Sequence, residues 1–563
     1  MHFGILCFSS SDHCADFGCA ACDLLCRQGL CLHRGIQAFL GHCQHQLDAV
    51  FLIDLGGTGV VIDGGDVGTG VQGADLVHHA LAHDVVGQAT EGLGTHDVAV
   101  AALHQLDHLG GLPTASVASC TDSSLPESSS LFASTTLSTM RYVTEPSKQL
   151  PVAAETEILV VGGGPAGFGA ALHAARMGRQ VMLIEQSGAV GGVATSGIMS
   201  HWTGKQEGGC FDELRQKARD CESEQVINPE KLRILMLDML CDAGVTVQLY
   251  TFFSDVIMDG ERVTGVITES KSGREVILCK MLIDSTGDGD VAARAGAPFE
   301  KGRDDGGMQP MTIMFKVAGV DMDRAVFFWG MDDTLKLPEG DLQTLGREKL
   351  PYPAGHVLLY PASIPGVVTI NMTNATDMDG TNVRDLNRAE YTCRNQIPAI
   401  IHFLRHYVPG YEGCYLIDSA DVVGVRETRR FNAHYQLNED DIAQARIFDD
   451  WVVTKSNFFF DLHNVEGAGL DAAAEYKSFH QPRPYTIPLR CFVPQKIQGL
   501  LLNGRNISGT HKAHSSYRVM PIVMNMGQAM GIVAALCVAQ GKAPLELDID
   551  EIHRELIRTD VTL

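Results

Sequence analysis

Residues 157–185 constrain the possible folds of this chain more than any other stretch. An apolar run at 158–161 is typical of a buried parallel strand. Three glycines follow at once in G-x-G-x-x-G spacing: Gly162, Gly164 and Gly167. In this pattern the first glycine permits a tight turn, the second lets the backbone approach a pyrophosphate, and the third lets the next helix pack closely. The stretch therefore predicts a dinucleotide-binding strand–helix–strand unit.

Residues around these glycines extend the predicted nucleotide site. Pro165 and Ala166 begin the predicted helix, where free N–H groups and partial positive charge favour phosphate. Glu185 ends the second strand, 18 residues after Gly167, where a carboxylate can accept ribose hydroxyls. A glycine pair follows, Gly191 and Gly192. It would let a second backbone stretch pass over the diphosphate toward an isoalloxazine ring, which a nicotinamide-binding domain does not need.

A meander and a second glycine loop follow. Asn228 and Pro229 predict the start of a helix that ends before Gly244. Turn signals at 259–260 and 272–273 predict an antiparallel meander, with Val256 contacting adenine through its backbone. The strand that closes the meander leads into a loop with three candidate cofactor contacts: Thr286, Gly287 and Asp288. A plain turn and a cation site remain alternatives for this loop.

The chain is expected to return to the nucleotide domain near its C-terminal end. A buried strand at 497–503 ends in Gly504 and Arg505, and Pro521 begins an apolar helix. Two residues of this helix are further candidate cofactor contacts: Gly527 and Gln528. The N-terminus of such a helix can stabilise negative charge on a reduced flavin. This return favours FAD over NAD.

Residues 301–494 are predicted to form an inserted domain that borders the substrate. Its strand at 422–425 leads into Arg426, and further charges follow at 427–430. These charges indicate an anion site, an ion network or an exposed charge cluster. We expect Arg426 and Arg518 to clamp an anionic substrate, and His511 and His514 to act as acid/base groups.

The first 139 residues differ in composition from the rest. They contain no Lys, Asn, Tyr or Trp, but hold 11 of the 22 histidines. We expect residues 1–139 to be a disordered or spurious extension, with the protein proper beginning at Met140. The alternative is a metal site, with iron–sulfur or zinc ligands drawn from this set: Cys14, Cys19, Cys22, Cys26, Cys31, Cys43, His33, His42 and His45.

Composition excludes several classes of partner. A formal net charge of −25 disfavours nucleic acid and anionic membrane surfaces. The sequence has no run of 18 apolar residues that would indicate a membrane span, and residues 1–10 do not resemble a signal peptide. The cysteines after residue 140 form no C-x-x-C pair, as in a cytoplasmic enzyme with reduced thiols.

Together these motifs resemble the large FAD-dependent oxidoreductase family that includes heterodisulfide-reductase-A-like proteins. More distantly they resemble the fumarate reductase and glutathione reductase flavin fold. The resemblance spans about residues 155–541 and rests on these motifs: Gly162-x-Gly-x-x-Gly167, Gly191-Gly192-x-Ala194-Thr195, Thr286-Gly-Asp-Gly-Asp290, Gly424-x-Arg-Glu-Thr-Arg-Arg430, Tyr485-x-Ile-Pro488, Gly504-Arg505 and Arg518-Val-Met-Pro-x-x-Met-x-Met-Gly-Gln-Ala529.

The resemblance implies an α/β fold that binds FAD. A Rossmann-like FAD-binding domain, with a parallel sheet and an antiparallel meander, would comprise residues 140–300 and 495–563. An α+β substrate domain would be inserted at 301–494. The expected activity is hydride transfer between a small-molecule substrate and flavin N5. One alternative is an electron-transfer subunit that works with an iron–sulfur partner protein. Another is a flavin-binding protein without turnover.

Overall fold

The computed structural model describes residues 50–54, 59–63, 141–218, 226–474 and 479–563. They belong to two units, Met1–Glu145 and Pro146–Leu563. In the first unit, β1 (Val50–Asp54) and β2 (Gly59–Asp63) form an antiparallel hairpin. The cysteines and histidines named above as candidate metal ligands lie outside the described residues.

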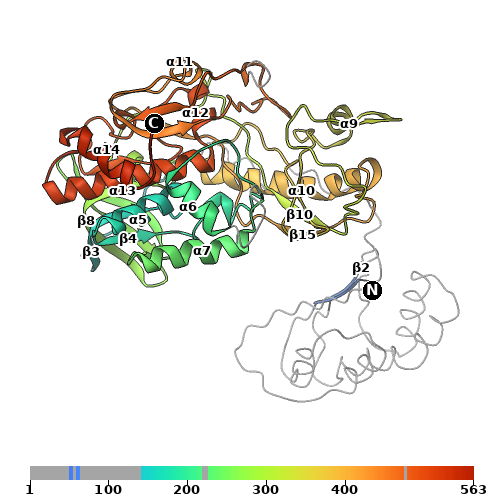
Figure 1. Ribbon diagram of the computed structural model, residues 1–563. Helices are drawn as coiled ribbons and strands as arrows, with labels where there is room; N and C mark the ends of the chain where they lie inside the picture. Colours follow the sequence, from blue (N-terminus) through green and yellow to red (C-terminus); the bar gives the residue numbers. More distant parts are fainter. Residues whose placement is uncertain (1–49, 55–58, 64–140, 219–225, 475–478) are drawn as a thin grey trace, which may run out of the picture. The chain divides into compact units, whose positions relative to one another are not determined.

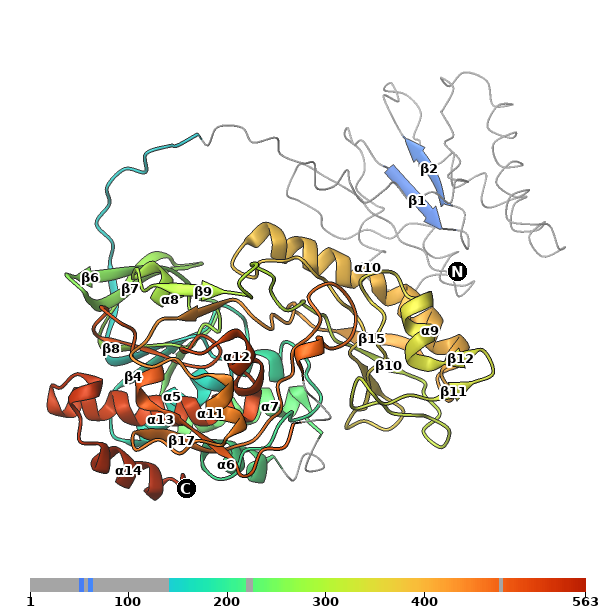
Figure 2. The same ribbon diagram turned by 90° about the horizontal axis from the view of Figure 1, so that it is seen from above.

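A seven-stranded sheet organises the second unit (Figures 1 and 2). Its order is β5-β4-β3-β8-β7-β6, and β19 pairs with β8. The strands are β3 (Val152–Val161), β4 (Val181–Ile184), β5 (Thr246–Gln248), β6 (Phe252–Asp259), β7 (Arg262–Ser270), β8 (Gly273–Asp284) and β19 (Leu500–Leu502). The β3–β4, β4–β5, β3–β8 and β8–β19 pairs are parallel, whereas β6–β7 and β7–β8 are antiparallel. This arrangement confirms the predicted parallel sheet with an antiparallel meander.

The middle of the sheet is buried, as the apolar runs predicted. Residues 158–161 of β3 are almost completely buried, and Val160 is paired with Leu183 on one side and Ile283 on the other. Leu501 of β19 pairs with Ile283. Strands paired on both sides and covered on both faces require apolar side chains throughout, which explains the continuous hydrophobic runs.

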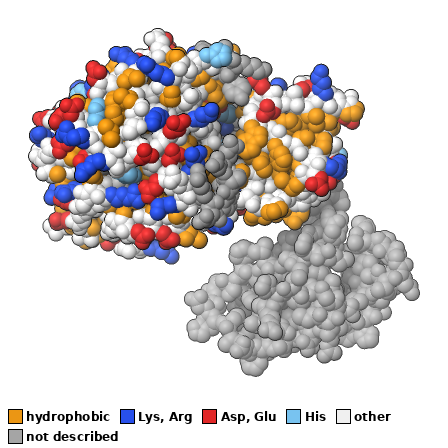
Figure 3. Space-filling model, viewed as in Figure 1, with side chains coloured by type: hydrophobic (Ala, Val, Ile, Leu, Met, Phe, Trp, Pro, Cys, Tyr) orange, Lys and Arg blue, Asp and Glu red, His pale blue; other side chains and the backbone are white. Residues whose placement is uncertain are grey.

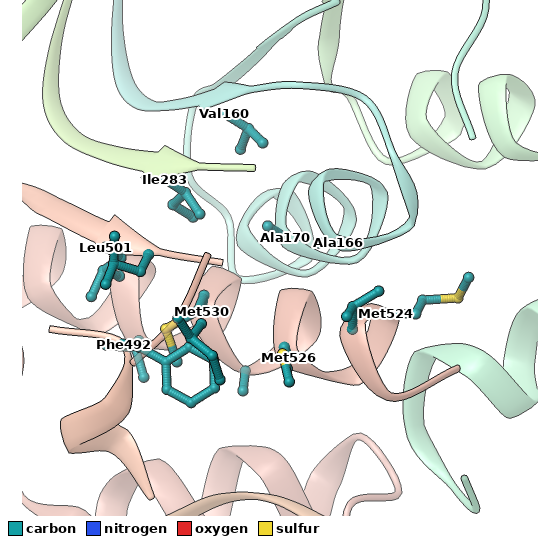
Figure 4. Packing of buried hydrophobic residues seen from close by; sticks show 14 of the residues in the cluster. Val160, Ala166, Ala170, Ile283, Phe492, Leu501, Met524, Met526 and Met530 are labelled. Atoms are coloured by element: carbon teal, nitrogen blue, oxygen red, sulfur yellow. The ribbon is translucent and has the colours of Figure 1, made fainter. Parts of the chain in front are cut away.

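Two helices, α5 (Pro165–Arg176) and α13 (Met520–Gln540), pack against each other and against the sheet. A Cβ at Gly527 would overlap the carbonyl oxygen of Ala166, and a Cβ at Gly531 would overlap that of Ala170. Glycine therefore allows the two backbones to touch. Figure 4 shows side chains of the helices, of the strands and of a nearby loop in one cluster: Ala166, Ala170, Met524, Met526, Met530, Val160, Ile283, Leu501 and Phe492.

Among the described helices, α13 is long and apolar enough to cross a membrane, with a mean hydropathy of 1.8. However, 89% of its most apolar window is buried inside the protein. It packs against α5, α6 (Gly209–Lys217) and α14 (Ile549–Arg558). The apolar character of α13 is therefore explained by its place in the protein core.

A second sheet lies beside the first in the same unit. Its four antiparallel strands, in the order β13-β14-β10-β15, are β13 (Leu359–Pro361), β14 (Val368–Ile370), β10 (Phe315–Ala318) and β15 (Tyr415–Ser419). Two helices, α9 (Leu342–Lys349) and α10 (Val383–Tyr407), share its core. Figure 3 shows hydrophobic side chains gathered on one face of this part. Tyr415, Leu416 and Ile417 of the edge strand β15 are exposed.

Residues after 428 return to the larger core. β16 (Arg429–Phe431) pairs with β9 (Phe299–Lys301), and β17 (Trp451–Ser456) pairs with β18 (Tyr485–Pro488). Phe431, Trp451 and Tyr485 belong to the same hydrophobic cluster as the seven-stranded sheet. The remaining strands and α-helices are α7 (Pro229–Asp242), α8 (Asp290–Arg294), β11 (Lys336–Leu337), β12 (Gly340–Asp341), α11 (Glu439–Ala443) and α12 (His511–Tyr517).

Candidate functional site

The glycine loop between β3 and α5 forms an open cradle at the C-terminal end of β3. Gly162 has φ +98°, and a Cβ there would overlap the Ser285 carbonyl oxygen. A Cβ at Gly167 would overlap the carbonyl oxygen of Gly162, whereas one at Gly164 would meet no other segment of the described residues within 4 Å. Gly164 also caps α5 without any side-chain hydrogen bond. The free N–H groups of the first turn thus face an open space, as an anion site requires.

Glu185 lies directly after β4, against this cradle. Its Oε2 accepts a hydrogen bond of 2.7 Å from the Gly163 N–H, and its Oε1 accepts one of 2.8 Å from the Ser187 N–H. Each oxygen of a carboxylate can accept a second hydrogen bond. The carboxylate is therefore oriented at the loop and retains acceptor capacity for a ribose.

The predicted glycine pair lies over the same loop. The Gly191 N–H donates to the Gly163 carbonyl oxygen at 2.8 Å. A Cβ on Gly192 would lie 3.1 Å from Cα of Gly164. Both glycines have positive φ, +105° and +52°. The pair brings a second stretch of backbone against the cradle, a close approach that side chains would hinder.

The loop after β8 and the residues after β19 meet, although 217 residues separate their charged partners. The Nη2 atom of Arg505 donates to Oδ1 of Asp288 at 2.9 Å, and a Cβ on Gly287 would lie 2.7 Å from the same Nη2. The other guanidinium nitrogen, Nη1, is buried without a partner among the described residues. Gly504 has φ +97°, and a Cβ there would lie 3.1 Å from Cβ of Ala166. Arg505 is thus close to the cradle, and its Nη1 could donate a hydrogen bond to a ligand.

A buried carboxyl organises the turn itself. Asp284 is fully buried and accepts hydrogen bonds from Thr286 N, Thr286 Oγ1 and Ala292 N. Burial raises the pKa of Asp284 to about 6. Thr286 Oγ1 also accepts from the Asp290 N–H at 2.9 Å. Thr286 therefore shapes the turn. Within the described residues no group of three or more potential metal ligands is found, and Asp288 and Asp290 pair with arginines.

Three predicted cofactor contacts have structural partners of their own. Val256 lies inside β6, opposite Val266, and its N–H donates to Oδ1 of Asp255. Gly527 lies where α13 crosses α5. Gln528 accepts from Cys210 N at 2.6 Å and donates both amide hydrogens to Thr559. A direct contact of these three with the cofactor stays a prediction.

A second set of polar residues is buried beside the second sheet. Arg518 donates to the carbonyl oxygen and to Oδ2 of Asp461, each at 2.9 Å. The Nε2 atom of His463 lies 3.5 Å from the same Oδ2. Burial would raise the pKa of Asp461, but His463 and the neighbouring arginines outweigh it and hold this pKa low. Asp461 is thus the anionic partner of Arg518.

Glu427 occupies the centre of a neighbouring ion-pair network. Its side chain is completely buried, and its Oε1 lies 2.5 Å from Nη1 of Arg430 and 2.7 Å from Nδ1 of His511. Because a carboxylate paired with arginine only accepts hydrogen bonds, the proton of a neutral His511 must be on Nδ1. Nε2 of His511 is then left as an acceptor.

Arg426 and His514 lack such partners. Arg426 is 8% exposed, its Nη1 donates to the Pro310 carbonyl oxygen at 2.6 Å, and no carboxylate among the described residues lies within 4 Å of it. Burial, reinforced by Arg518, lowers the pKa of Arg426 to about 10. His514 is 1% exposed, and neither of its ring nitrogens has a partner in the described part of the chain. Burial also lowers its pKa.

Sequence reasoning missed three residues that border Arg426 and Arg518. His356 is buried with both ring nitrogens unpartnered within the described ranges, and burial lowers its pKa to about 3. Tyr360 is buried at the end of the second sheet, and Gln309 Oε1 accepts from His463 N at 3.2 Å. Each is a single polar residue in an ordinary sequence context. No local pattern marks such residues, because only the fold brings them together.

The family comparison decides what binds in the cradle. The family described as "FAD dependent oxidoreductase" matches residues 157–556. The chain belongs to this family. Its cofactor is FAD, as predicted. The narrower resemblance to heterodisulfide-reductase-A-like proteins stays a prediction.

Several solved structures match this chain at low sequence identity. A geranylgeranyl bacteriochlorophyll reductase-like protein from Thermoplasma acidophilum has 13% identity and a TM-score of 0.40, over 72% of this chain and 84% of that chain. The flavin-dependent brominase Bmp2 gives the same values. The p-nitrophenol 4-monooxygenase PnpA from Pseudomonas putida DLL-E4 has 11% identity and a TM-score of 0.37, over 72% and 87%.

The cradle of this FAD-dependent oxidoreductase fits its cofactor. Gly164 leaves open space beside the uncapped start of α5, where the pyrophosphate would bind. Glu185 is oriented for the adenosine ribose, and Arg505 has a buried donor for which the described residues provide no acceptor. These groups complement the phosphates and hydroxyls of a dinucleotide.

Proposed function

We propose that this oxidoreductase transfers a hydride between a small-molecule substrate and N5 of the flavin. The substrate would bind beside the second sheet, among the polar residues around Arg426, Arg518 and His511. One observation carries the proposal: the buried Glu427 holds His511 by Nδ1 at 2.7 Å, which frees Nε2 to accept a proton.

The proposed reaction separates a hydride from a proton. When bound, FAD supplies the two-electron chemistry by accepting or returning the hydride at N5. In the oxidative direction, His511 Nε2 takes the proton that the substrate hydroxyl or amine loses. In the reductive direction, the same atom returns it. Glu427 stabilises the imidazolium that forms, because its carboxylate lies against Nδ1.

Neighbouring side chains would hold the substrate in position. Arg518 is kept in place by two hydrogen bonds to Asp461, and its side chain is only 11% exposed. Arg426 is buried close enough to Arg518 for its pKa to be lowered by it. A buried arginine attracts an anionic group of the substrate strongly, since little water screens its charge, and Arg426 is the one without a carboxylate partner among the described residues.

An anaerobic reduction experiment tests the proposal. The purified protein is mixed with candidate donors, and the flavin absorbance is followed in wild type, in H511Q and in the distant control H406Q. Bleaching by a small metabolite that is slowed at least about 100-fold in H511Q, and unchanged in H406Q, is the expected result. His406 suits the control because it lies exposed at the end of α10.

Other outcomes would favour the alternatives. Bleaching only by a reduced iron–sulfur protein would support an electron-transfer subunit. No bleaching by any donor would support a flavin-binding protein without turnover. Equal rates in wild type and H511Q would contradict the role assigned to His511.

A further inference from the structure

The arginines around the candidate substrate site differ in one respect. Four have a carboxylate partner within 3 Å: Arg429 with Asp290 at 2.9 Å, Arg430 with Glu427 at 2.5 Å, Arg505 with Asp288 at 2.9 Å and Arg518 with Asp461 at 2.9 Å. Arg426 is the exception in the part of the chain that the structure describes. Arg426 and Arg430 are nevertheless the two buried residues among these five.

The hydrogen bonds of Arg426 are also incomplete. A guanidinium has five N–H donors, and the described residues provide one acceptor, the Pro310 carbonyl oxygen at 2.6 Å. A buried cation is costly unless it is paired and hydrogen-bonded. An anion that is not part of the described protein would therefore stabilise Arg426 by neutralising its buried charge.

Other titratable side chains that interact electrostatically with Arg426 do not supply that charge. Burial lowers the pKa of His356 to about 3, and burial together with Arg426 lowers the pKa of His463, so neither imidazole provides a negative charge. Burial also raises the pKa of Cys393 to about 11, which keeps its thiol neutral. Asp461 attracts Arg426 at longer range, but it is in contact with Arg518. The positive charges of Arg426 and Arg518 and the negative charge of Asp461 add up to one net positive charge.

We propose that the substrate carries a single carboxylate, and that this group binds Arg426. The inference rests on the proposed function, because it names the substrate class of the same site. A planar carboxylate accepts two parallel N–H bonds from a guanidinium and neutralises one charge. A phosphate, with nearly two negative charges at neutral pH, would overcompensate the single positive charge of this site.

Arg426 then determines specificity, whereas Arg518 is a positioning residue for this site. Arg518 has its own anion in Asp461, and it reinforces the need for a ligand by repelling Arg426. A neutral substrate of the same shape would leave the Arg426 charge buried and unpaired. The site would therefore discriminate against esters and amides of its substrate.

Formate, the smallest carboxylate, is the first probe, with formamide as its neutral counterpart. Thermal unfolding of the purified holoprotein is measured in wild type, in R426M and in the control R324M. Arg324 is 57% exposed and paired with Glu412. Formate is expected to raise the unfolding midpoint of wild type and R324M by roughly 2 °C near tenfold saturation, and not that of R426M. Formamide is expected to affect all three alike.

The same data can overturn the inference. An equal formate response in wild type and R426M would show that the carboxylate binds elsewhere. If R426M does not fold, R426K takes its place, because lysine keeps the charge but loses the two-pronged geometry. The expected formate shift in R426K is less than half that of wild type, and an undiminished shift would contradict the proposal.

A second measurement separates this inference from the proposed function. A donor that bleaches the flavin is compared with its methyl ester. At least about 100-fold slower bleaching by the ester is expected in wild type, with the difference lost in R426M. Equal bleaching by acid and ester would overturn the carboxylate inference while supporting the oxidoreductase. A normal formate response without any bleaching would support the carboxylate inference and count against the proposed oxidoreductase reaction.

Discussion

The Nδ1 atom of His511 lies 2.7 Å from Oε1 of Glu427, in a position where the carboxylate is completely inaccessible to solvent. The two residues are 84 positions apart in the chain. The contact assigns the tautomer of the imidazole and thereby the atom that can exchange a proton with a substrate. The contact joins two features that the sequence showed separately. One is the charged segment at 427–430, and the other is His511, a candidate acid/base group.

Replacing this carboxylate is expected to slow turnover without releasing the cofactor. In E427Q, the amide can present an N–H to His511 and disturb the tautomer. We expect flavin reduction by a competent donor to slow by about 10- to 100-fold, with the flavin content unchanged. Stopped-flow absorbance measures the rate. E412Q, which changes an exposed carboxylate on the surface, is expected to react as wild type does. Loss of flavin in E427Q would contradict the positioning role.

The open side of Gly164 predicts a variant that folds but binds FAD poorly. Apart from its chain neighbours and its own helix, no described residue has an atom within 4 Å of a methyl group at G164A, so the chain can accept it. The same methyl would occupy the approach of the pyrophosphate. We expect FAD affinity to fall at least about tenfold, with an unchanged far-UV circular dichroism spectrum. G413A serves as the control, because its Cβ would make only ordinary contact at 3.5 Å. Normal flavin content in G164A would argue against this cradle.

The contact between α5 and α13 is expected to be intolerant of a single added methyl. In G531A, the new Cβ would overlap the Ala170 carbonyl oxygen, which belongs to the backbone and cannot move aside alone. We expect the free energy of unfolding to fall by about 1–3 kcal/mol in urea titrations. A539S, at an exposed position of the same helix, should change it by less than about 0.5 kcal/mol. Comparable stability of the two variants would contradict the close packing.

Asp284 is expected to make stability depend on pH. Burial raises its folded pKa to about 6, compared with about 3.9 in an unfolded chain. The folded state therefore binds the proton more tightly, so this contribution is complete below about pH 4 and is lost as pH rises through 6. The stability of wild type relative to D284N should fall by roughly 3 kcal/mol over this window. D304N, at an exposed site, is the control. A difference that stays constant or grows with pH would refute the assignment.

Much of the nucleotide half of the site could be predicted from local sequence. Apolar residues at 158–161 indicate a buried strand because every side chain there faces protein. Asn228 accepts from the N–H groups of Glu230 and Lys231, as the cap signal predicted for α7. The Gly162–Gly167 spacing was also predictive because its effects are local. The tight turn, the approach of the backbone to the pyrophosphate and the packing of the helix all depend on residues close together in the chain.

The substrate half depends on contacts between distant segments. In the sequence, Arg426 and Arg518 are equivalent candidates. In the structure, Asp461 neutralises Arg518, whereas no carboxylate of the described residues pairs with Arg426, which gives the two arginines different chemistry. Tyr360 of β13 and His356, which precedes that strand, join them without any local signal. The sequence by itself determined the cofactor class, because local periodicity and glycine sterics act at short range. Only the tertiary structure decided which charges are paired, because ion pairing and burial depend on which distant segments the fold brings together.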